Sequence, residues 1–218
     1  MSPRPLIVVG GSGMGREAVW LARCLPAEWS VSGILDDAPA RQGKTIDEVP
    51  VLGTVSQWTS WKDSWFIIAI GDPRTRKSIF DRMCALGAPR FATLVHPSVQ
   101  LSSSVRILEG TIVAANSVLT VDVAVGRHCL LNTAVTVAHE CVIGDFCTLA
   151  PQSAVSGNVR LDDGVEVGTG ARLIQGLKMG RGSMLAAGSV ATKDIAAGAF
   201  AAGYPARSLK TLPPFPAA

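Results

Sequence analysis

The chain has 218 residues, of which 48% are hydrophobic and 17% are charged, so it contains enough apolar residues for a substantial core. A formal net charge of +3, with Lys and Arg scattered along the chain, argues against a nucleic-acid partner. No long apolar run predicts a membrane span, and the short run near the N-terminus is unlike a signal peptide. The five cysteines form no CxxC pair, which favours reduced thiols in a cytoplasmic protein.

The first 95 residues alternate between strand and helix patterns. Apolar runs predict strands over residues 6–10, 31–35, 49–52, 65–70 and 92–95. Helical spacing predicts helices over 13–25 and 74–86, with a short helical piece in "SQWTSWKD" between the third and fourth of these strands. Strands and helices in this order predict a small parallel sheet of the doubly wound kind. We therefore expect a Rossmann-like domain over residues 1–95.

The first predicted strand runs into a glycine-rich turn, "GGSGMG", which is similar to the dinucleotide-binding fingerprint G-x-G-x-x-G. Gly10 and Gly15 match the fingerprint, but Ser12 stands where a glycine would let the backbone approach a pyrophosphate. The acidic pair Asp36 and Asp37 follows about 20 residues later, where a ribose-binding carboxylate belongs. The interpretation as an NAD(P)-dependent oxidoreductase has this turn as its only support. That support is not specific, because a helix N-terminus attracts the phosphate of any nucleotide.

From Leu101 onward, an aliphatic residue or methionine recurs at every sixth position without an insertion, through fifteen positions that end at Leu185. A strict six-residue period fits a parallel β-helix whose triangular coil has three six-residue sides. Fifteen hexads make about five coils, stacked about 4.8 Å apart as parallel strands are. We assign these positions to the core alone. The β-helix is expected over residues 96–195, followed by a C-terminal extension and loose tail over 196–218.

The three histidines, His96, His128 and His139, are the first candidates for chemistry on such a rod. They contain no close pair of the kind that zinc sites use, so we expect no metal. His139 follows the inward-facing Val137 by two residues, so it should project outward near a corner. An exposed imidazole beside a carboxylate is a usual general base, and Glu140 follows at once. Glu140 can take part only if the chain bends there, and a structural role for His139 remains equally open on these residues alone.

Several stretches together resemble one family of hexapeptide-repeat acyltransferases. The rod carries "LNTAVTVAHECVIGDFCTLAP" and "GYPARSLK", and the N-terminal half carries "VVGGSGMGREAVWLA", "GILDD", "IAIGDPRTRKSI" and "LVHPSV". Residues 5–210 resemble the sialic-acid O-acetyltransferase-like family, which includes bacterial nucleotide-amino-sugar N-acetyltransferases. The resemblance implies an α/β Rossmann-like domain followed by a left-handed parallel β-helix. It also implies a homotrimer with active sites between neighbouring rods.

The activity that this resemblance implies is transfer of an acetyl group from acetyl-CoA to the amine of a nucleotide-linked amino sugar, such as a 4-amino-4,6-dideoxy sugar used in glycan biosynthesis. His139 would be the general base, oriented by Glu140, and the backbone amide of Gly157 would stabilise the oxyanion. Asn132 also matches an active-site position of the family. The alternative is O-acetylation of a sialic-acid-like sugar, which needs the same base. A non-catalytic, sugar-binding β-helix would leave the His139–Glu140 pair unexplained.

The resemblance also assigns the glycine turn to the acceptor substrate. The nucleotide-sugar site would comprise Gly10, Gly11, Ser12, Gly13, Gly15, Asp36, Asp37 and Arg76. Coenzyme A would lie along the later coils, near Gly157, Gly168, Ala187, Tyr204 and Pro205. Two positions depart from the family: Thr148 stands where members often carry a second histidine, and Met14 where a histidine commonly precedes the last glycine. The first departure bears on substrate identity more than on the reaction.

Overall fold

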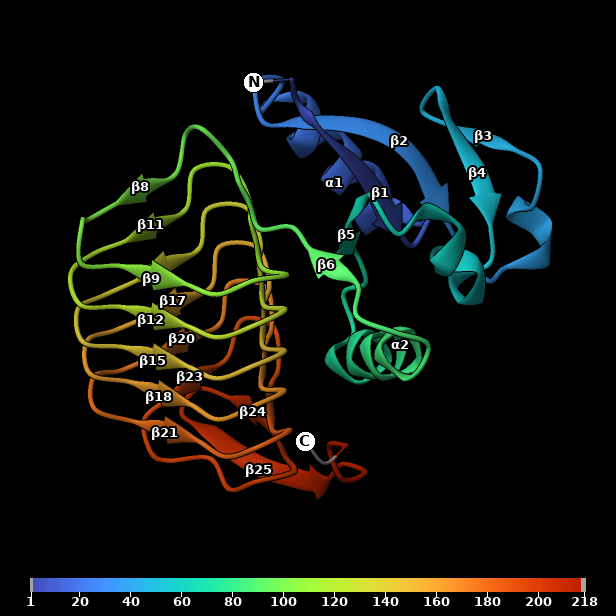
Figure 1. The fold of residues 1–218 in the computed structure, drawn as a ribbon. Helices are drawn as coiled ribbons and strands as arrows, with labels where there is room; N and C mark the ends of the chain where they lie inside the picture. The colour runs from blue at the N-terminus through green and yellow to red at the C-terminus, as the bar shows by residue number, and fades with distance from the viewer. Residues whose placement is uncertain (1, 217–218) are drawn as a thin grey trace.

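The computed structural model describes residues 2–216, and it places an α/β unit beside a triangular rod of stacked coils (Figure 1). The sheet of the α/β unit has the order β3-β4-β2-β1-β5-β6. Its strands are β1 (Arg4–Val9), β2 (Trp29–Leu35), β3 (Thr45–Ile46), β4 (Val49–Gly53), β5 (Trp65–Ile68) and β6 (Arg90–Phe91). Neighbouring strands are parallel except β3 and β4, which form an antiparallel hairpin. The strand order reverses at β1, the place where open α/β sheets bind ligands.

Two helices cover opposite faces of this sheet. Helix α1 (Gly13–Arg23) lies on one face, whereas α2 (Pro73–Ala85) and the 3-10 segment η2 (Val55–Trp61) cover the other. A second 3-10 turn, η1 (Pro39–Arg41), follows β2. Alternate side chains of β1 divide between the two cores, as strand geometry requires. The central strand is therefore buried on both faces, as expected of a parallel sheet.

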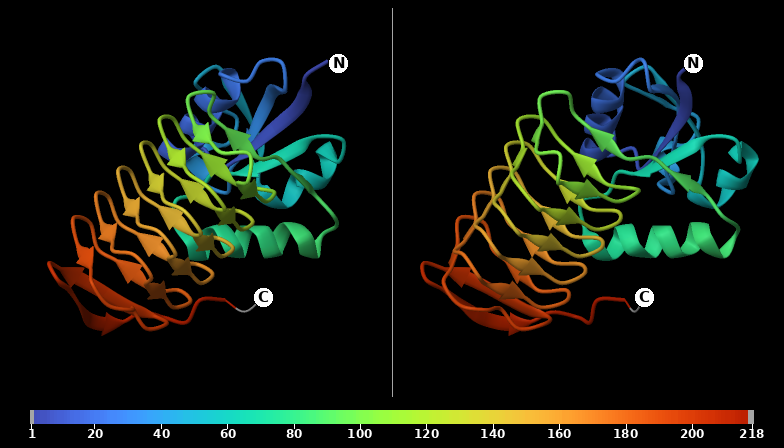
Figure 2. Two further views of the ribbon diagram at one scale, coloured as in Figure 1. Left: turned by 90° about the vertical axis from the view of Figure 1, so that its left-hand side faces the viewer. Right: turned by 60° about the vertical axis from the view of Figure 1, so that its left-hand side comes forward.

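The rod is a parallel β-helix with three sheets, and each coil gives one two-residue strand to each sheet (Figure 2). The first rod sheet contains β7 (Leu94–Val95), β10 (Ile112–Val113), β13 (Leu130–Leu131), β16 (Thr148–Leu149), β19 (Glu166–Val167) and β22 (Met184–Leu185). The second contains β8 (Gln100–Leu101), β11 (Val118–Leu119), β14 (Thr136–Val137), β17 (Ala154–Val155), β20 (Arg172–Leu173) and β23 (Val190–Ala191). The third contains β9 (Arg106–Ile107), β12 (Ala124–Val125), β15 (Val142–Ile143), β18 (Arg160–Leu161) and β21 (Lys178–Met179).

The predicted fold class is confirmed, because the hexad positions build this rod. Each of the fifteen positions is the second residue of a strand from β8 to β22. From Val113 to Leu185 these side chains are at most 2% exposed, whereas Leu101 at the start of the rod is 43% exposed. The predicted strand over 92–95 is correct only for residues 94–95, which form β7 and pair with β10 of the rod. The strand that pairs with β5 in the α/β unit is β6, just before the predicted range. Two successive strands therefore belong to different units of the fold.

An antiparallel hairpin of β24 (Ala199–Gly203) and β25 (Ala206–Thr211) extends the first rod sheet and ends the rod. The chain then returns toward α2 (Figure 1). The expected loose tail is wrong for the residues up to Pro216, because Phe215 is buried. The last two residues of that predicted tail, 217 and 218, lie outside the described residues.

The two units are joined at one corner of the rod, which we name the aromatic corner: residues 108–111, 126–129, 144–147, 162–165 and 180–183, between the third and first sheets. Arg76 of α2 reaches into it and is 1% exposed. Burial lowers the pKa of Arg76 to about 10, and oxygen acceptors from both units surround its guanidinium. They are the carbonyls of Ile70, Gly71, His128, Phe146 and Cys147, and Thr148 Oγ1.

This environment corrects the expectation that Arg76 contacts substrate. All three guanidinium nitrogens of Arg76 donate hydrogen bonds inside the protein. A buried cation with its donors occupied is not available to a ligand, and its loss would leave several buried carbonyls unpaired. Arg76 is therefore an anchor between the α/β unit and the rod.

His128 forms the apolar part of the same contact. Its ring stacks on Phe146 at 5.1 Å between centroids, and Phe80 and Phe91 pack around it at 4.6 and 4.5 Å. Neither ring nitrogen has a hydrogen-bond partner in the part of the chain that the structure describes. Burial, together with the charges of nearby arginines, lowers the pKa of His128 to about 3. The imidazole is thus neutral at pH 7 and behaves as one more aromatic ring.

We expect His128→Phe to remove an acid-sensitive step in stability. The native imidazole stays neutral down to about pH 3, whereas an unfolded histidine binds a proton below about pH 6.5. Because the unfolded state binds the extra proton, native stability should fall by about 1.4 kcal/mol per pH unit as the pH drops through this window. Urea unfolding from pH 7 to pH 4 should show a flatter profile for His128→Phe than for the wild type. Equal slopes for His128→Phe and the wild type would contradict this account.

Candidate functional site

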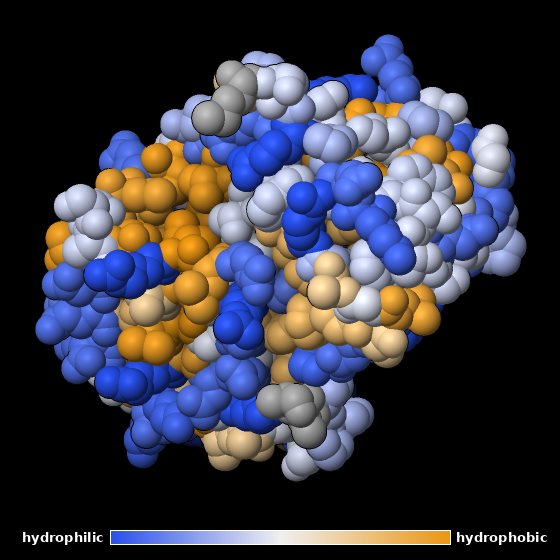
Figure 3. Space-filling model, viewed as in Figure 1, coloured by the Kyte–Doolittle hydropathy of each residue, from blue (hydrophilic) through white to orange (hydrophobic). Residues whose placement is uncertain are grey.

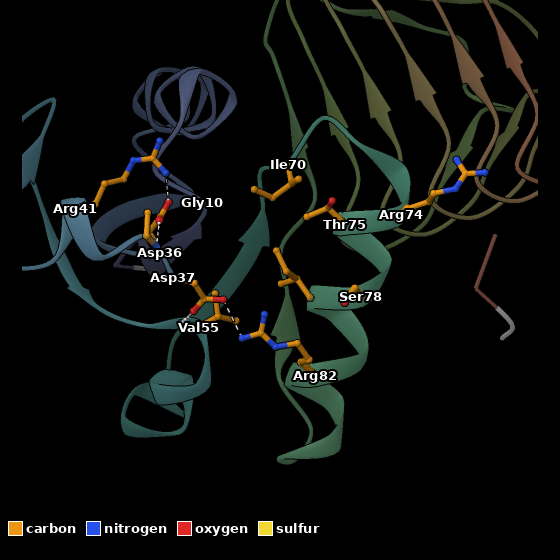
Figure 4. A pocket seen from close by; sticks show the side chains of 12 residues that line it. Gly10, Asp36, Asp37, Arg41, Val55, Ile70, Arg74, Thr75, Ser78 and Arg82 are labelled. Atoms are coloured by element: carbon orange, nitrogen blue, oxygen red, sulfur yellow. Dashed lines mark hydrogen bonds and ion pairs between the residues drawn. The ribbon is translucent and has the colours of Figure 1, made fainter. Parts of the chain in front are cut away.

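A cavity of about 510 Å³ lies at the carboxyl ends of β1, β2 and β5. Gly10 follows β1, Asp36 and Asp37 follow β2, and Ile70 follows β5 (Figure 4). The first turns of α2 form the opposite wall. The cavity thus occupies the position where the strand order of the sheet reverses, and there open α/β sheets place their ligands. We call it the nucleotide cavity.

Asp36 orders the backbone at the edge of this cavity. Its carboxylate accepts hydrogen bonds from the amides of Gly11 at 2.6 Å and Ala38 at 2.8 Å, and it pairs with Arg41 at 2.8 Å. Burial alone would raise the pKa of Asp36, but the two amides and the arginine outweigh it and hold that pKa below its usual value. An ionised Asp36 therefore fixes both the glycine turn and the Arg41 side chain.

Three arginines that the sequence did not single out line the cavity: Arg41, Arg74 and Arg82. Asp37 pairs with Arg82 at 2.9 Å and accepts from the Val55 amide at 2.9 Å. The guanidinium groups of Arg41 and Arg82, beside backbone amides, suit the phosphates of a nucleotide, whereas that of Arg74 donates to carbonyls outside the cavity. Arg74 could have been noticed in the sequence, because it stands in the predicted first turn of a helix that follows a strand.

The glycines of the turn have different roles. Gly10 has φ +107°, and a Cβ there would lie 2.6 Å from Ile70 Cδ1. A side chain on Gly15 would overlap the Gly10 carbonyl, so this glycine permits the close approach of α1 to β1. Ser12 is the N-cap of α1 without a side-chain cap bond, and the space beside Gly13 is open. The positive end of the α1 dipole is therefore accessible to an anion.

A second cavity, of about 480 Å³, lies on the other side of the glycine turn, between α1 and the first rod sheet. Asn132 and Thr148 line it from the rod, and Gly13 lines it from the turn. The Thr148 hydroxyl donates to the Gly71 carbonyl at 2.7 Å and accepts from Arg76 at 2.9 Å. At the position where the resemblance leads us to expect a second histidine, this chain thus has a hydroxyl that helps to join the two units.

His139 and Glu140 lie at a different corner of the rod, between the second and third sheets. We name residues 120–123, 138–141, 156–159 and 174–177 the histidine corner. Glu140 has φ +59°, which bends the chain and lets two consecutive side chains meet. His139 Nδ1 and Glu140 Oε2 are 3.0 Å apart, and both side chains are more than half exposed. The corner supplies the bend that the pair requires.

Gly157 lies one coil further along, against the His139 ring. A Cβ on Gly157 would collide with His139 Nε2, so only glycine leaves the imidazole in this position. The next amide, that of Asn158, donates to the His139 carbonyl at 2.8 Å. Among residues 2–216 the Gly157 amide has no acceptor. The corner therefore offers an exposed imidazole and a free backbone N–H together.

The structure does not gather all the predicted site residues within one chain. The remaining rod candidates, Asn132, Gly168 and Ala187, lie at the third corner, between the first and second sheets. Tyr204 and Pro205 are exposed at the turn between β24 and β25. The α/β unit packs on the first rod sheet, and the histidine corner is the vertex opposite that sheet. His139 thus faces away from the glycine turn of its own chain.

Residues 2–216 offer neither a metal site of the usual kind nor a membrane-spanning helix. They contain no group of three His, Cys, Asp or Glu side chains that could hold a metal ion. Within the same range, neither helix is long and apolar enough to cross a membrane.

Comparisons with known proteins cover both units of the fold. Residues 5–83 match the PglD N-terminal domain family. The chain is 30% identical to PerB from Caulobacter crescentus, solved in complex with CoA and GDP-perosamine, with 94% of this chain and 97% of that one covered and a TM-score of 0.86. It is 32% identical to the acetyltransferase domain of PglB from Neisseria gonorrhoeae, solved with acetyl coenzyme A, with 95% and 100% covered and a TM-score of 0.85.

A curated relative matches over a shorter segment. The chain is 43% identical over 53 residues to UDP-N-acetylbacillosamine N-acetyltransferase from Bacillus subtilis. This match spans 24% of the chain and 24% of that relative.

We expect Asp36→Ala to weaken nucleotide binding. The substitution leaves the Gly11 amide and Arg41 without their acceptor. The expected loss is about 1–3 kcal/mol, which corresponds to a roughly 5- to 150-fold loss of affinity. Calorimetry with UDP, GDP and dTDP would identify the nucleotide that the wild type binds. The affinity of Asp36→Ala for that nucleotide is then measured in the same way. The exposed Asp63→Ala serves as the matched control. Unchanged affinity for that nucleotide in Asp36→Ala would contradict the role given to Asp36.

Proposed function

The chain belongs to the hexapeptide-repeat family of nucleotide-amino-sugar N-acetyltransferases, and from this premise we propose that it transfers an acetyl group from acetyl-CoA to the amine of a nucleotide-linked amino sugar. The observation that carries the proposal is the histidine corner. There Nδ1 of the exposed His139 imidazole pairs with Glu140, and Nε2 lies against the backbone of Gly157. A histidine that served only the fold would not stand more than half exposed on the outside of the rod.

His139 acts as the general base in this proposal. Glu140 accepts a hydrogen bond from Nδ1–H, which keeps the lone pair on Nε2. Nε2 then takes a proton from the amine as that amine attacks the thioester carbonyl. Acetyl-CoA supplies the acetyl group, and the products are an amide and the free thiol of coenzyme A. The Gly157 amide donates to the carbonyl oxygen as negative charge develops there.

The two substrates have separate binding regions. The nucleotide diphosphate lies at the glycine turn, between Gly11, Gly13 and the Asp36–Asp37 region, where free helix amides and arginines meet. Coenzyme A follows the later coils along Gly168 and Ala187 toward the exposed hairpin turn at Tyr204 and Pro205. O-acetylation of a sugar hydroxyl is the second candidate, since His139 would serve it equally well. The amine is favoured because the relatives named above include UDP-N-acetylbacillosamine N-acetyltransferase.

We further propose a homotrimer in which the histidine corner of one chain meets the glycine turn of the next. The separation of His139 from its own nucleotide cavity requires a second chain to complete the site. Val121, Val142 and Ile174, on or beside the histidine corner, are each more than a third exposed. Apolar surface lies open over the coils of the rod in the space-filling view (Figure 3), as is typical of a face that another protein covers.

A cytoplasmic location is part of the same proposal. All five cysteines are free thiols, and three of them are buried in the rod. Reduced thiols and a need for acetyl-CoA both fit the cytoplasm.

His139→Ala should lower kcat by about two to four orders of magnitude, the usual contribution of a general base. The fold should persist, because the His139 side chain is more than half exposed and its partner, Glu140, is exposed as well. The assay is thiol release from acetyl-CoA with 4-amino-4,6-dideoxy sugars linked to UDP, GDP and dTDP, and His96→Ala is the control. Near-normal turnover in His139→Ala would overturn the mechanism. Absence of turnover by the wild type with every sugar would count against the function.

Mixed trimers test the composite site. His139→Ala lacks the base and Asp36→Ala lacks an ordered turn, so each variant alone should be slow. Because a site takes its base from one chain and its turn from the next, co-assembly at equal amounts should restore about a quarter of the wild-type sites at subsaturating sugar. A site built within one chain would give no recovery above the sum of the two separate variants.

A further inference from the structure

The end of the described chain, Pro213–Pro216, occupies a place that the rod leaves vacant. At the aromatic corner, positions one coil apart carry His128 and then Phe146, but the next two carry Gly164 and Gly182. A side chain on Gly164 would overlap the Phe215 ring, and a Cβ on Gly182 would lie 2.7 Å from Phe215 Cβ. Phe215 is 6.5 Å from Phe146 between ring centroids. It therefore continues the aromatic column where the rod itself has no side chains.

Two arginines hold this segment on either side of Phe215. Arg74 of α2 donates from Nη2 to the Pro213 carbonyl at 2.8 Å and to the Gly182 carbonyl at 3.1 Å. Arg181 of the rod donates to the Pro216 carbonyl at 2.7 Å. Both guanidinium carbons lie within 6 Å of the Phe215 ring centroid. The segment is thus bound to the α/β unit and to the rod at once.

Arg74 connects this binding to the nucleotide cavity. It is the second residue of α2, and the first turns of that helix, including Thr75 and Ser78, form a wall of the cavity. In Figure 4 the Arg74 side chain points away from the Asp37–Arg82 pair, toward the rod. The Arg74 guanidinium therefore fixes the N-terminal end of α2. The first turns of this helix, which the guanidinium holds in place, form the wall of the cavity.

We propose that the segment Pro213–Pro216 is a positioning element that fixes the first turn of α2 and so shapes the nucleotide cavity, with Phe215 as its principal side chain. In naming the cavity as the acceptor site, this inference rests on the proposed function. The effect is separable from general unfolding because Arg76, farther along α2, keeps its own acceptors at the rod. Loss of the Phe215 side chain should therefore increase the mobility of the first turn of α2, while the Arg76 anchor between the two units stays intact.

The test is Phe215→Ala, with Leu209→Ala on the exposed face of β25 as the control. Hydrogen exchange of the first turn of α2 should be about tenfold faster in Phe215→Ala than in the wild type. The KM for the nucleotide sugar should rise about five- to twentyfold, while kcat and the KM for acetyl-CoA stay within about twofold. A role confined to overall stability would change exchange across the whole protein and leave the KM for the sugar unchanged.

Two glycine variants isolate the position that Phe215 fills. Gly164 and Gly170 have φ +66° and +64°, so an alanine strains the backbone equally at both, but only the one at Gly164 meets Phe215. Gly164→Ala should reproduce the exchange seen in Phe215→Ala, and Gly170→Ala should not.

Unchanged exchange at α2 in Phe215→Ala would overturn the proposal, and so would faster exchange with unchanged affinity for nucleotide. That affinity is measured with UDP, GDP and dTDP by calorimetry, so it does not depend on turnover. If the wild type acetylated none of the sugars, the proposed function would fail, while exchange and nucleotide binding would still decide the positioning role.

Discussion

The buried guanidinium of Arg76 is the contact on which the arrangement of the two units depends. Corner turns of the rod leave the carbonyls of His128 and Phe146 without a donor from the next coil, and Arg76 donates to both. It also donates to the Cys147 carbonyl, which the Leu130 amide shares, and to the Thr148 hydroxyl. Hydrogen bonds to a charged group are worth about 1.5–3 kcal/mol each, so the set offsets part of the cost of burying this cation, whose pKa burial still lowers to about 10. Because α2 is fixed in this way, the glycine turn lies over the first rod sheet, beside Asn132 and Thr148.

The same coil geometry that builds the rod also builds its two functional columns. Successive coils pair in register with a step of eighteen residues, so Val121, His139 and Gly157 lie in one column at one corner. His128, Phe146, Gly164 and Gly182 lie in another. A glycine in either column opens space for a ring from elsewhere in the chain, at Gly157 for the imidazole and at Gly164 for Phe215. Within a column, a glycine therefore determines which ring can pack there, just as a large side chain does.

Much of this arrangement could be predicted from the sequence, because a six-residue period allows few solutions. The hexads predict every strand from β8 to β22, and one coil of eighteen residues places Gly157 beside His139. The anchor could not be predicted: an arginine in a helix looks solvated, and its rod acceptors lie between 52 and 72 residues away. The same holds for Phe215, whose place is defined by two glycines far from it. Contacts made to backbone carbonyls, or at corner positions that carry only glycine, produce no periodic pattern in the sequence.

Thr148 shows how anchoring and chemistry interact in this chain. With its hydroxyl engaged by Arg76 and Gly71, this side chain has no donor left for a substrate oxygen. In the proposed mechanism, the Gly157 amide stabilises the developing charge, and the imidazole that lies against this glycine takes the proton. The left-handed turn at Glu140 and its 3.0 Å contact with Nδ1 hold the ring there. Proton transfer and charge stabilisation in the proposed mechanism therefore both depend on the shape of this one corner.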